Sequence, residues 1–472
     1  MKFKEAINNK LFNTISDCAD QLGLDCYVVG GFVRDAYLKI DSKDVDILVI
    51  GSGIEMAKLV SKKLKNTSKI KIFKTYGVAM LKYLDYEIEF VGARKESYSD
   101  NSRNPNISTG TFEDDINRRD FTINSLALGL NKNNYGKLID LHNGKEDIES
   151  KTIRTPLNPK VTFNDDPLRM LRAIRFASTL EFKIDKENIN VISNLSARIE
   201  IITKERIVEE INKILLSNKP SIGFLLLENT GLLKIILPEI SDLKGIDEIE
   251  GQTHKENFYH TLEVVDNISK ETDNLWLRWA ALLHDIGKVS TKKFNKKIGW
   301  TFHGHEFEGS KMVYRIFKRL KMPLNEKMKY VQKIVLMSSR PIVLAQDNIT
   351  DSAVRRLIFD AGDYIDDLMT LCEADITTKN KERYKKYRQN FKNVRNKIAE
   401  VEERDNIRNF QPPITGQQIM KTFNIKPCKN VGQIKEAIKE AILEGEIKNN
   451  PDEAYNLMIK EGKKLGLKPN ER

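Results

Sequence analysis

The chain has 472 residues, of which 40% are hydrophobic, and a formal net charge of +11 at pH 7. This length exceeds what one hydrophobic core ordinarily serves, so three or four domains are expected. No apolar run approaches the roughly 20 residues of a membrane-spanning helix, which excludes an integral helical membrane protein, and the positive charge favours a polyanionic partner such as nucleic acid.

The cysteines are few, and their spacing is not that of metal ligands. They are Cys18, Cys26, Cys372 and Cys428. Such usage is typical of a reduced protein, and we expect a cytoplasmic location. The N-terminal stretch MKFKEAINNKLFNTISDCADQLG is charged and helical in pattern, without the apolar centre of a signal peptide.

The first 150 residues mix predicted strands and helices. Apolar runs bounded by Gly, Asp and Lys predict the strands, and apolar residues at helical spacing predict the helices. In chain order these are a helix at 3–22, a strand at 26–29, a helix at 32–39, a strand at 45–50, a helix at 54–65 and strands within 71–83 and 86–94.

From about residue 165 the pattern is helical. The segments DPLRMLRAIRFAS, TKERIVEEINKILLS and SIGFLLLENTGLLKIIL carry helical spacing, and 254–378 is helical again. A very basic stretch follows at 379–397, before a Pro/Gly break, QPPITG. The predicted fold class is therefore α+β, with a mixed-sheet head at 1–150 and all-α parts at 151–245, 246–378 and 379–472.

Two acids open the second predicted strand. Asp44 and Asp46 are separated by one residue, so both side chains project from the same face. Paired carboxylates attract a hard divalent cation, and Mg²⁺ prefers carboxylates together with substrate phosphates. Two such ions can clamp the attacking and leaving oxygens of a phosphoryl transfer. A polar strand entry is the alternative for these two acids alone.

A glycine turn precedes these acids and favours the metal-site interpretation. Gly30 and Gly31 lie between a predicted strand and a helix, where backbone N–H groups and the helix dipole can receive phosphate oxygens. Arg34 in the first helical turn can reach the same phosphates. A third carboxylate is expected from Glu87 or Glu89 on the strand at 86–94.

Three blocks together resemble one family. GGFVRD followed by DVD, RRDFTINSLALG (118–129) and DDPLRMLRAIRFA (165–177) are similar to the signatures of the class II tRNA nucleotidyltransferases and poly(A) polymerases. The resemblance covers about residues 25–240 and implies a polymerase-β-like head with Asp44 and Asp46 as ligands of two Mg²⁺ ions. It also implies triphosphate contacts by Gly31, Arg34 and Arg119, and nucleotide contacts by Asp166, Arg169, Arg172 and Arg175.

The chemistry of DDPLR suits a choice between bases. Asp166 accepts hydrogen bonds and Arg169 donates them, and both are expected near the start of one helix, with Asp166 as its cap. Cytosine and adenine each present an amino donor beside a ring-nitrogen acceptor, whereas uracil and guanine present the reverse. One Asp–Arg pair can thus bind C and A and reject U and G. A capped helix with a surface ion pair is the alternative.

The histidines gather in the middle of the chain. Five of the six lie between 254 and 305, and His284 directly precedes Asp285 at the end of an apolar segment. This pattern resembles the HD phosphohydrolase domain, and the resemblance implies metal ligands at His260, His284 and Asp285, with a transition metal as one possible occupant. Further ligand candidates are His303 or His305, and Asp375. Ser338 stands where related enzymes commonly carry a histidine, which leaves open whether this domain is active or serves only to bind tRNA.

The sequence thus predicts an enzyme that adds C, C and A to the tRNA 3′ end from CTP and ATP without a template. The basic tail at 379–472 is expected to bind tRNA. A poly(A) polymerase or an enzyme adding only CC or only A is the alternative, although the paired basic signature of poly(A) polymerases is missing from KIFKTYGVAMLKY. An HD-type metal-dependent phosphohydrolase is a more distant alternative. The oligomeric state is left open.

Overall fold

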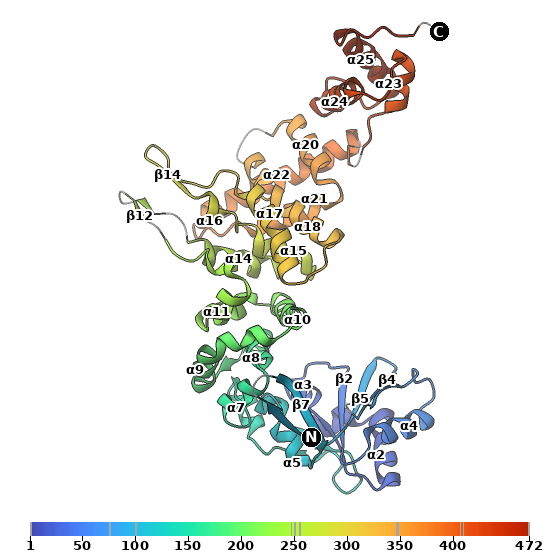
Figure 1. Cartoon of the computed structure of the whole chain (residues 1–472), viewed down its shortest axis with the longest axis vertical. Helices are drawn as coiled ribbons and strands as arrows, with labels where there is room; N and C mark the ends of the chain where they lie inside the picture. Colours follow the sequence, from blue (N-terminus) through green and yellow to red (C-terminus); the bar gives the residue numbers. More distant parts are fainter. Residues whose placement is uncertain are drawn as a thin grey trace. The chain divides into compact units, whose positions relative to one another are not determined.

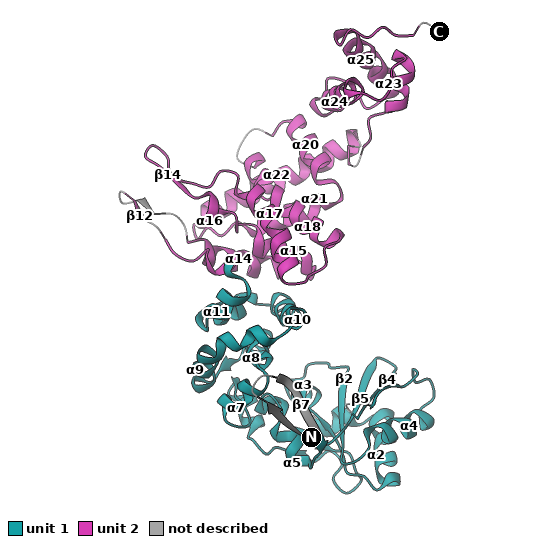
Figure 2. Cartoon of the chain, viewed as in Figure 1, with its two compact units in different colours: residues 1–238 teal, residues 239–472 magenta. Residues whose placement is uncertain are grey.

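The chain forms two compact units, residues 1–238 and 239–472 (Figure 2). The computed structural model describes residues 2–74, 77–99, 102–246, 248–249, 252–253, 256–345, 349–405, 407–408 and 410–470. Within those residues, every helix is too short or too polar to cross a lipid bilayer.

A seven-stranded mixed sheet forms the centre of the head, in the order β3-β4-β5-β2-β1-β8-β9 (Figure 1). Strand β2 runs parallel to β5 and antiparallel to β1, so the two strands beside it carry their residues in fixed register with its acids. The strands are β1 (Cys26–Val29), β2 (Asp44–Val49), β3 (Lys71–Phe73), β4 (Val78–Tyr83), β5 (Tyr86–Gly92), β8 (Ala127–Gly129) and β9 (Leu138–Ile139). A separate hairpin joins β6 (Arg94–Ser99) to β7 (Ser102–Thr109).

Helices α2 (Lys10–Leu22) and α4 (Gly53–Lys63) pack together beside this sheet (Figure 1). The Asn9 side chain accepts the backbone N–H groups of Leu11 and Phe12, and Gly23 ends α2 in the left-handed conformation, so both ends of the helix are capped. The remaining head helices are α1 (Lys2–Ile7), α3 (Gly31–Leu38), α5 (Phe112–Asn117) and α6 (Gly144–Glu149), with a 3₁₀ turn at Thr122–Asn124. The predicted mixed-sheet head is confirmed.

Unit 1 continues as a helical neck. Helix α8 packs against α10 and α11, which gives the neck its core. The helix predicted from DPLRMLRAIRFAS is α8, which begins at Leu168, and a short helix that was not predicted, α7, ends just before it at Asp165. The neck elements are α7 (Pro159–Asp165), α8 (Leu168–Leu180), α9 (Lys186–Leu195), α10 (Lys204–Leu215), α11 (Pro220–Asn229), α12 (Leu232–Ile236) and a 3₁₀ turn at Ser196–Ile201, and α13 (Pro238–Ser241) begins at the last residue of unit 1.

Unit 2 is helical, as predicted. Its helices are α14 (Asn257–Ile268), α15 (Leu275–Leu283), α16 (Lys288–Thr291), α17 (His305–Arg319), α18 (Glu326–Met337), α19 (Arg340–Leu344), α20 (Asp351–Ala361), α21 (Ile365–Ala374), α22 (Lys381–Asp405), α23 (Gly416–Phe423), α24 (Lys429–Glu444) and α25 (Pro451–Lys464), with a 3₁₀ turn at Gly362–Tyr364. Short two-stranded pairs interrupt the helical parts: β10 (Thr152–Ile153) with β11 (Lys183–Ile184) in the neck, and β12 (Glu248–Ile249) with β13 (Gln252–Thr253) and β14 (Lys293–Asn295) with β15 (Gly299–Thr301) in unit 2. The expectation of purely helical parts missed these pairs, whose strands are too short to give a periodic pattern.

Candidate active site

The two predicted acids lie at the start of β2. Asp44 and Asp46 line one cavity, as their spacing predicted, while Val45 between them is buried in the core. Asp44 is exposed and Asp46 is half-buried. Burial raises the pKa of the Asp46 carboxyl, and the guanidinium of Arg119 opposes this rise. A cation at this edge would relieve that penalty.

A third carboxylate stands on the neighbouring strand. Glu89 is in register with Asp46 on parallel strand β5. Burial, and then the nearby charge of Asp46, raise the pKa of Glu89. Glu87, the other sequence candidate, is exposed and pairs with Lys82. Glu89 is therefore the better candidate for the third carboxylate beside Asp44 and Asp46.

Gly30 forms the floor between the acids and a guanidinium. Its φ is +79°, and a Cβ there would lie 3.0 Å from Arg119 Nη1 and 3.2 Å from Asp46 Oδ2. Gly31, the first residue of α3, has more room, since its Cβ would meet only Arg34 Nη2 at 3.6 Å. The turn therefore needs glycine at Gly30 on conformational and steric grounds. The sequence pattern alone did not show which of the two glycines is the more constrained.

Arg34 and Arg119 both reach the cavity. Arg34 Nη1 donates to Asn124 Oδ1 at 2.7 Å, and its Nη2 lies 2.7 Å from Asp35 Oδ1. Arg119 Nη2 donates to Asp115 Oδ2 at 3.1 Å. The buried Nε of Arg119 has no hydrogen-bond partner among the described residues. Both guanidiniums are thus held in place from one side.

Asp120 and Asn124 connect these groups to the neck. Asp120 Oδ2 accepts from Arg172 Nε at 2.7 Å, and Asp120 Oδ1 accepts from Asn124 Nδ2 at 3.0 Å. Although burial opposes ionisation, Arg172 and Asn124 lower the pKa of Asp120 to about 2. The block RRDFTINSLALG contains Asp120 and Asn124, but its local pattern predicts a role for neither. Their separation of four residues beside the paired arginines was the available signal.

The ring of Phe176 lies among three guanidiniums. The Cζ atoms of Arg175, Arg34 and Arg172 are 4.1, 5.0 and 5.6 Å from its centroid. Arg175 Nε also lies 3.2 Å from Glu210 Oε2, yet neither atom forms a hydrogen bond among the described residues. Burial lowers the pKa of Arg175 to about 10. A ring face between like charges reduces their mutual repulsion.

These groups surround one cavity of about 570 Å³ within unit 1. It combines acids at one edge with guanidiniums over its wall, which suits a ligand with several phosphates and a metal. The lining residues are Gly30, Gly31, Phe32, Arg34, Asp35, Ser42, Asp44, Asp46, Arg119, Asp120, Asn124, Arg172, Arg175, Phe176, Thr179, Lys213 and Leu216.

Asp166 and Arg169 are not brought into that lining. Asp166 Oδ1 accepts the backbone N–H of Leu168 at 3.1 Å, so it caps α8 as its position predicted. Arg169 Nη2 donates to the backbone oxygen of Arg118 at 2.7 Å. No ion pair joins Asp166 to Arg169 in the described part of the chain. Both side chains are half-buried beside the cavity and engaged elsewhere.

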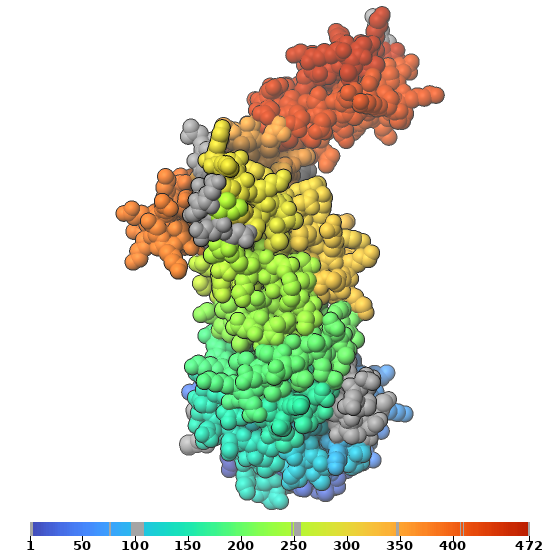
Figure 3. Space-filling view, turned by 60° about the vertical axis from the view of Figure 1, so that its left-hand side comes forward, coloured from blue at the N-terminus to red at the C-terminus, as the bar shows by residue number. Residues whose placement is uncertain are grey.

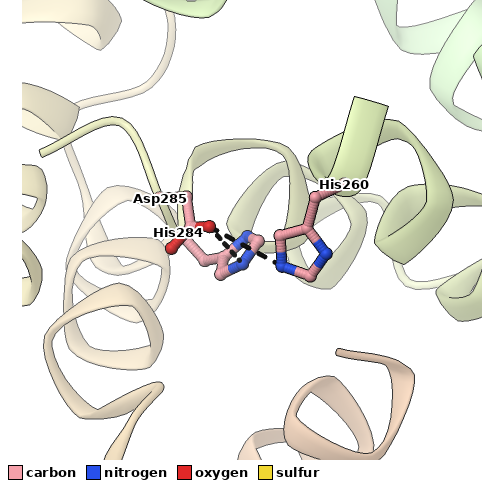
Figure 4. Close-up of side chains that lie close together, drawn as sticks. All are labelled: His260, His284 and Asp285. Atoms are coloured by element: carbon pink, nitrogen blue, oxygen red, sulfur yellow. Dashed lines mark ion pairs between the residues drawn. The ribbon is translucent and has the colours of Figure 1, made fainter. Parts of the chain in front are cut away.

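Unit 2 holds a second cluster of ionisable groups (Figure 4). His260 of α14, His284 at the end of α15 and Asp285 are buried, and their ligand atoms lie within 4.8 Å of one another. Asp375, at the end of α21, places Oδ1 at 2.7 Å from His260 Nε2 and 3.8 Å from His284 Nε2. Four groups from three helices therefore converge, three of them predicted as first ligands.

Two buried atoms of this cluster lack hydrogen bonds among the described residues: His284 Nε2 and Asp375 Oδ1. Asp375 Oδ1 nevertheless forms an ion pair with His260 Nε2. Buried polar atoms are normally satisfied, so a cluster of converging ligand atoms with unmet hydrogen-bonding capacity fits a metal ion. The other ring nitrogens are oriented, since His284 Nδ1 lies 2.8 Å from the Ala281 oxygen and His260 Nδ1 lies 3.0 Å from Thr377 Oγ1.

The residues around this cluster show which of the other predicted ligand candidates lie near it. His305 Nε2 lies 3.7 Å from Asp285 Oδ1, whereas His303 is exposed. Lys288 Nζ donates to Asp285 Oδ2 at 2.7 Å. Ser338 is buried and donates to the Val335 oxygen of its own helix at 3.0 Å. Ser338 thus offers no imidazole to the cluster. His254, the fifth histidine of the group, lies outside the described residues.

Comparisons with known proteins agree with this architecture. Residues 26–154 match the Poly A polymerase head domain, 181–244 match the family described as probable RNA and SrmB-binding site of polymerase A, and 257–406 match the HD domain. The HD match extends through α22, which the sequence boundary at 378 had assigned to the tail.

Curated relatives decide the family. A Multifunctional CCA protein of Psychromonas ingrahamii is 33% identical over 64% of this chain and 71% of its own length. The chain belongs to the tRNA nucleotidyltransferase and poly(A) polymerase family. A Multifunctional CCA protein of Shewanella denitrificans is 30% identical over 74% of this chain and 83% of its own length. An A-adding tRNA nucleotidyltransferase of Deinococcus radiodurans is 30% identical over 73% and 78%.

Solved structures of this family share the fold. The Thermotoga maritima CCA-adding enzyme complexed with tRNA aligns over 98% of this chain and 99% of its own, with a TM-score of 0.61 and 20% identity. A CCA-adding enzyme in complex with ATP aligns over 96% and 95%, with a TM-score of 0.63 and 20% identity. At these identities the likeness concerns the fold.

Proposed function

We propose that this protein is a template-independent CCA tRNA nucleotidyltransferase, which adds C, C and A to the tRNA 3′ end from CTP and ATP. The observation that carries the proposal is the single cavity in which Asp44 and Asp46 face Arg34, Arg119, Arg172 and Arg175. Relatives named as CCA or A-adding enzymes support it. Such an enzyme meets its tRNA in the cytoplasm.

The acids on β2 and β5 fit two Mg²⁺ ions. Asp44 and Asp46 would be the ligands, and Glu89 is in register to support them. Burial of Asp46 beside two other carboxylates raises the cost of holding their charges without a cation. Bound Mg²⁺ would lower the pKa of the tRNA 3′-hydroxyl and neutralise the departing pyrophosphate.

The arginines bind and orient the triphosphate. Arg34 and Arg119 present guanidiniums on either side of the Gly30 turn, and each is already fixed by Asn124 or Asp115. Because their partners hold them before the nucleotide arrives, little ordering entropy remains to be lost on binding. Arg172 and Arg175 extend the positive wall toward the neck.

Base choice is assigned to Asp166 and Arg169. For these two residues to read a base, Arg169 must give up its hydrogen bond to the Arg118 oxygen and donate to the base edge instead. Asp166 must accept from the base edge with the carboxylate that also accepts the Leu168 N–H. A wrong base leaves two desolvated groups facing unsuitable partners, at a cost of about 1–3 kcal/mol each. Arg118 immediately precedes Arg119, so the exchange would couple base choice to the triphosphate site.

The deciding experiment uses tRNA that lacks its 3′ end. CTP and ATP are supplied singly and together, and the products are sized. Addition that stops after three nucleotides supports the proposal, whereas a ladder of A supports the poly(A) polymerase and addition of only CC or only A supports a partial enzyme. The Asp46→Ala variant should add neither nucleotide, and retained addition of either one contradicts the assignment.

We infer a second, metal-dependent activity in unit 2, that of an HD-type phosphohydrolase. The convergence of Asp375 Oδ1 on both histidines, together with His284 Nε2, which forms no hydrogen bond among the described residues, carries this inference. His260, His284, Asp285 and Asp375 would hold the metal, which could be a transition metal because two ligands are imidazoles. Release of phosphate from nucleotide substrates with added Mn²⁺ or Ni²⁺ tests it. If the wild-type protein binds the metal but releases no phosphate with any metal tested, the result favours a domain that only binds tRNA.

A further inference from the structure

The first turns of helix α22 have no buried face. All residues from 381 to 389 are exposed, whereas Phe391, Val394 and Ile398 further along are buried. In the space-filling view this orange segment projects from the rest of unit 2 (Figure 3). A helix with no apolar face gains nothing from packing on its own domain. Its ordered turns therefore offer a surface to a partner.

The charge of this segment selects an anionic partner. Residues 379–397 contain nine Lys and Arg and one acid, Glu382. Six of the bases make no ion pair with any described residue: Lys379, Lys381, Arg383, Lys385, Lys386 and Lys392. Tyr384 and Tyr387 stand among them, 44% and 37% exposed. Cations interleaved with exposed rings are typical of surfaces that bind single-stranded nucleic acid, because the rings stack on bases.

A pocket lies where α22 meets the domain. Its volume is about 440 Å³, within the range of sites for small molecules. Tyr387 and Phe391 of α22 form one side, opposite Ile342 and Ile376. Asn390 Nδ2 donates to the Ala345 oxygen at 2.7 Å and fixes the helix beside the pocket. Two aromatic rings and aliphatic side chains suit a planar base.

The same pocket ends at the metal-ligand cluster. Asp375 and Thr377 line it, and both contact His260, through Nε2 at 2.7 Å and Nδ1 at 3.0 Å. Basic turns, an aromatic pocket and a cluster of metal ligands thus follow one another within unit 2.

We propose that these three parts form one binding site for a single-stranded RNA end. Lys385, Lys386 and their neighbours hold the backbone phosphates, and the terminal base enters the pocket beside Tyr387, next to the cluster. The proposal rests on the proposed function in taking RNA as the polymer, but it requires no catalysis at either site. It explains why the exposed turns are both basic and aromatic.

Binding can be measured with a fluorescein-labelled RNA octamer by anisotropy in EDTA, without nucleotides. The double variant Lys385→Gln, Lys386→Gln should bind roughly tenfold more weakly at 0.1 M salt, and its log–log salt slope should fall by about 1.4, which is about 0.7 for each phosphate contact. The control is Lys293→Gln with Lys297→Gln, two exposed lysines of the β14–β15 hairpin that is not part of the pocket. Equal affinities of the two double variants overturn the proposal.

The pocket is tested with 2-aminopurine as the 3′-terminal base. Stacking should quench its fluorescence on binding to wild type and to Tyr384→Leu, whose ring lies outside this pocket, but not to Tyr387→Leu. Quenching that persists in Tyr387→Leu overturns the placement of the base. Displacement of the RNA by polyglutamate as readily as by unlabelled RNA overturns the choice of partner in favour of an acidic protein. Loss of nucleotide addition at the head would change none of these readings.

Discussion

A single amide connects the two walls of the head cavity. Asn124 accepts from Arg34 of α3 and donates to Asp120, which in turn accepts from Arg172 of α8. The positions of a head arginine and a neck arginine are therefore correlated through one side chain. Because each bond involves a charged or buried partner, each is stronger than an ordinary surface hydrogen bond.

The two glycines of the turn should respond differently to alanine. Gly30→Ala strains a residue with φ of +79° and forces its methyl against Arg119 and Asp46, so we expect kcat to fall at least 100-fold. Gly31→Ala meets only a flexible guanidinium and should stay within a few-fold. Steady-state CTP addition measures both. Equal losses in the two variants, or a tolerated Gly30→Ala, would show that Gly30 does not shape the site.

Asp120 should make the head sensitive to acid. Its pKa is lowered to about 2, so its contribution is present above the unfolded value near 4 and is lost as the pH falls through 2. We expect the difference in unfolding free energy between wild type and Asp120→Asn to shrink by about 2 kcal/mol between pH 5 and pH 2.

Urea unfolding followed by circular dichroism measures this difference. The transition of unit 2 is identified separately by fluorescence, since all three tryptophans, Trp276, Trp279 and Trp300, lie there. Asp41→Asn serves as the control, because Asp41 is exposed and, among the described residues, forms an ion pair only with Lys43. A difference for Asp120→Asn that is independent of pH would contradict the assignment.

At the level of helices and strands, features set by residues close together in the sequence could be predicted better than contacts between residues far apart in it. The strand carrying Asp44 and Asp46, and the helix capped by Asp166, could be predicted because their signals lie within a few residues. Asn124 and Phe176 could not be assigned roles, since both contact Arg34, which lies 90 or more residues earlier in the chain. The split at α7–α8 follows from Pro167, which favours an extended residue before it.

Helix α8 allows base choice to be separated from helix capping. Asp166→Asn keeps an oxygen for the Leu168 N–H but adds an amide donor, so the cap survives while the discrimination against U weakens. We expect the CTP-over-UTP preference to fall roughly 10–100-fold, with little change in the apparent affinity for CTP triphosphate. Asp166→Ala should lose the preference and also destabilise the helix by about 1 kcal/mol.

Competition between CTP and UTP on tRNA lacking its 3′ end measures this preference. Asp165→Ala, which removes the neighbouring carboxylate, should leave the preference unchanged. UTP incorporation by Asp166→Asn and Asp166→Ala at the wild-type level would assign base choice to other residues.

At the scale of the whole molecule, the chain carries two candidate centres of different chemistry. The head offers carboxylates with guanidiniums, which suit Mg²⁺ and a triphosphate, whereas unit 2 offers imidazoles with carboxylates, which also suit softer metals. Each centre is built entirely from residues of one compact unit. Their metals should therefore be removable one at a time.

This independence gives the last prediction. His284→Ala removes one of two imidazoles from the unit 2 cluster, so bound Mn²⁺ or Ni²⁺, counted by mass spectrometry after dialysis, should fall 10-fold or more. Addition of CTP and ATP in Mg²⁺ should stay within twofold, because the head cavity is lined by residues of unit 1 and His284 belongs to unit 2. His303→Ala is the matched control: this histidine is exposed, and we expect its metal content to equal that of wild type. Unchanged metal in His284→Ala would remove the cluster as a metal site, and a parallel loss of nucleotide addition would mean that the two centres are coupled.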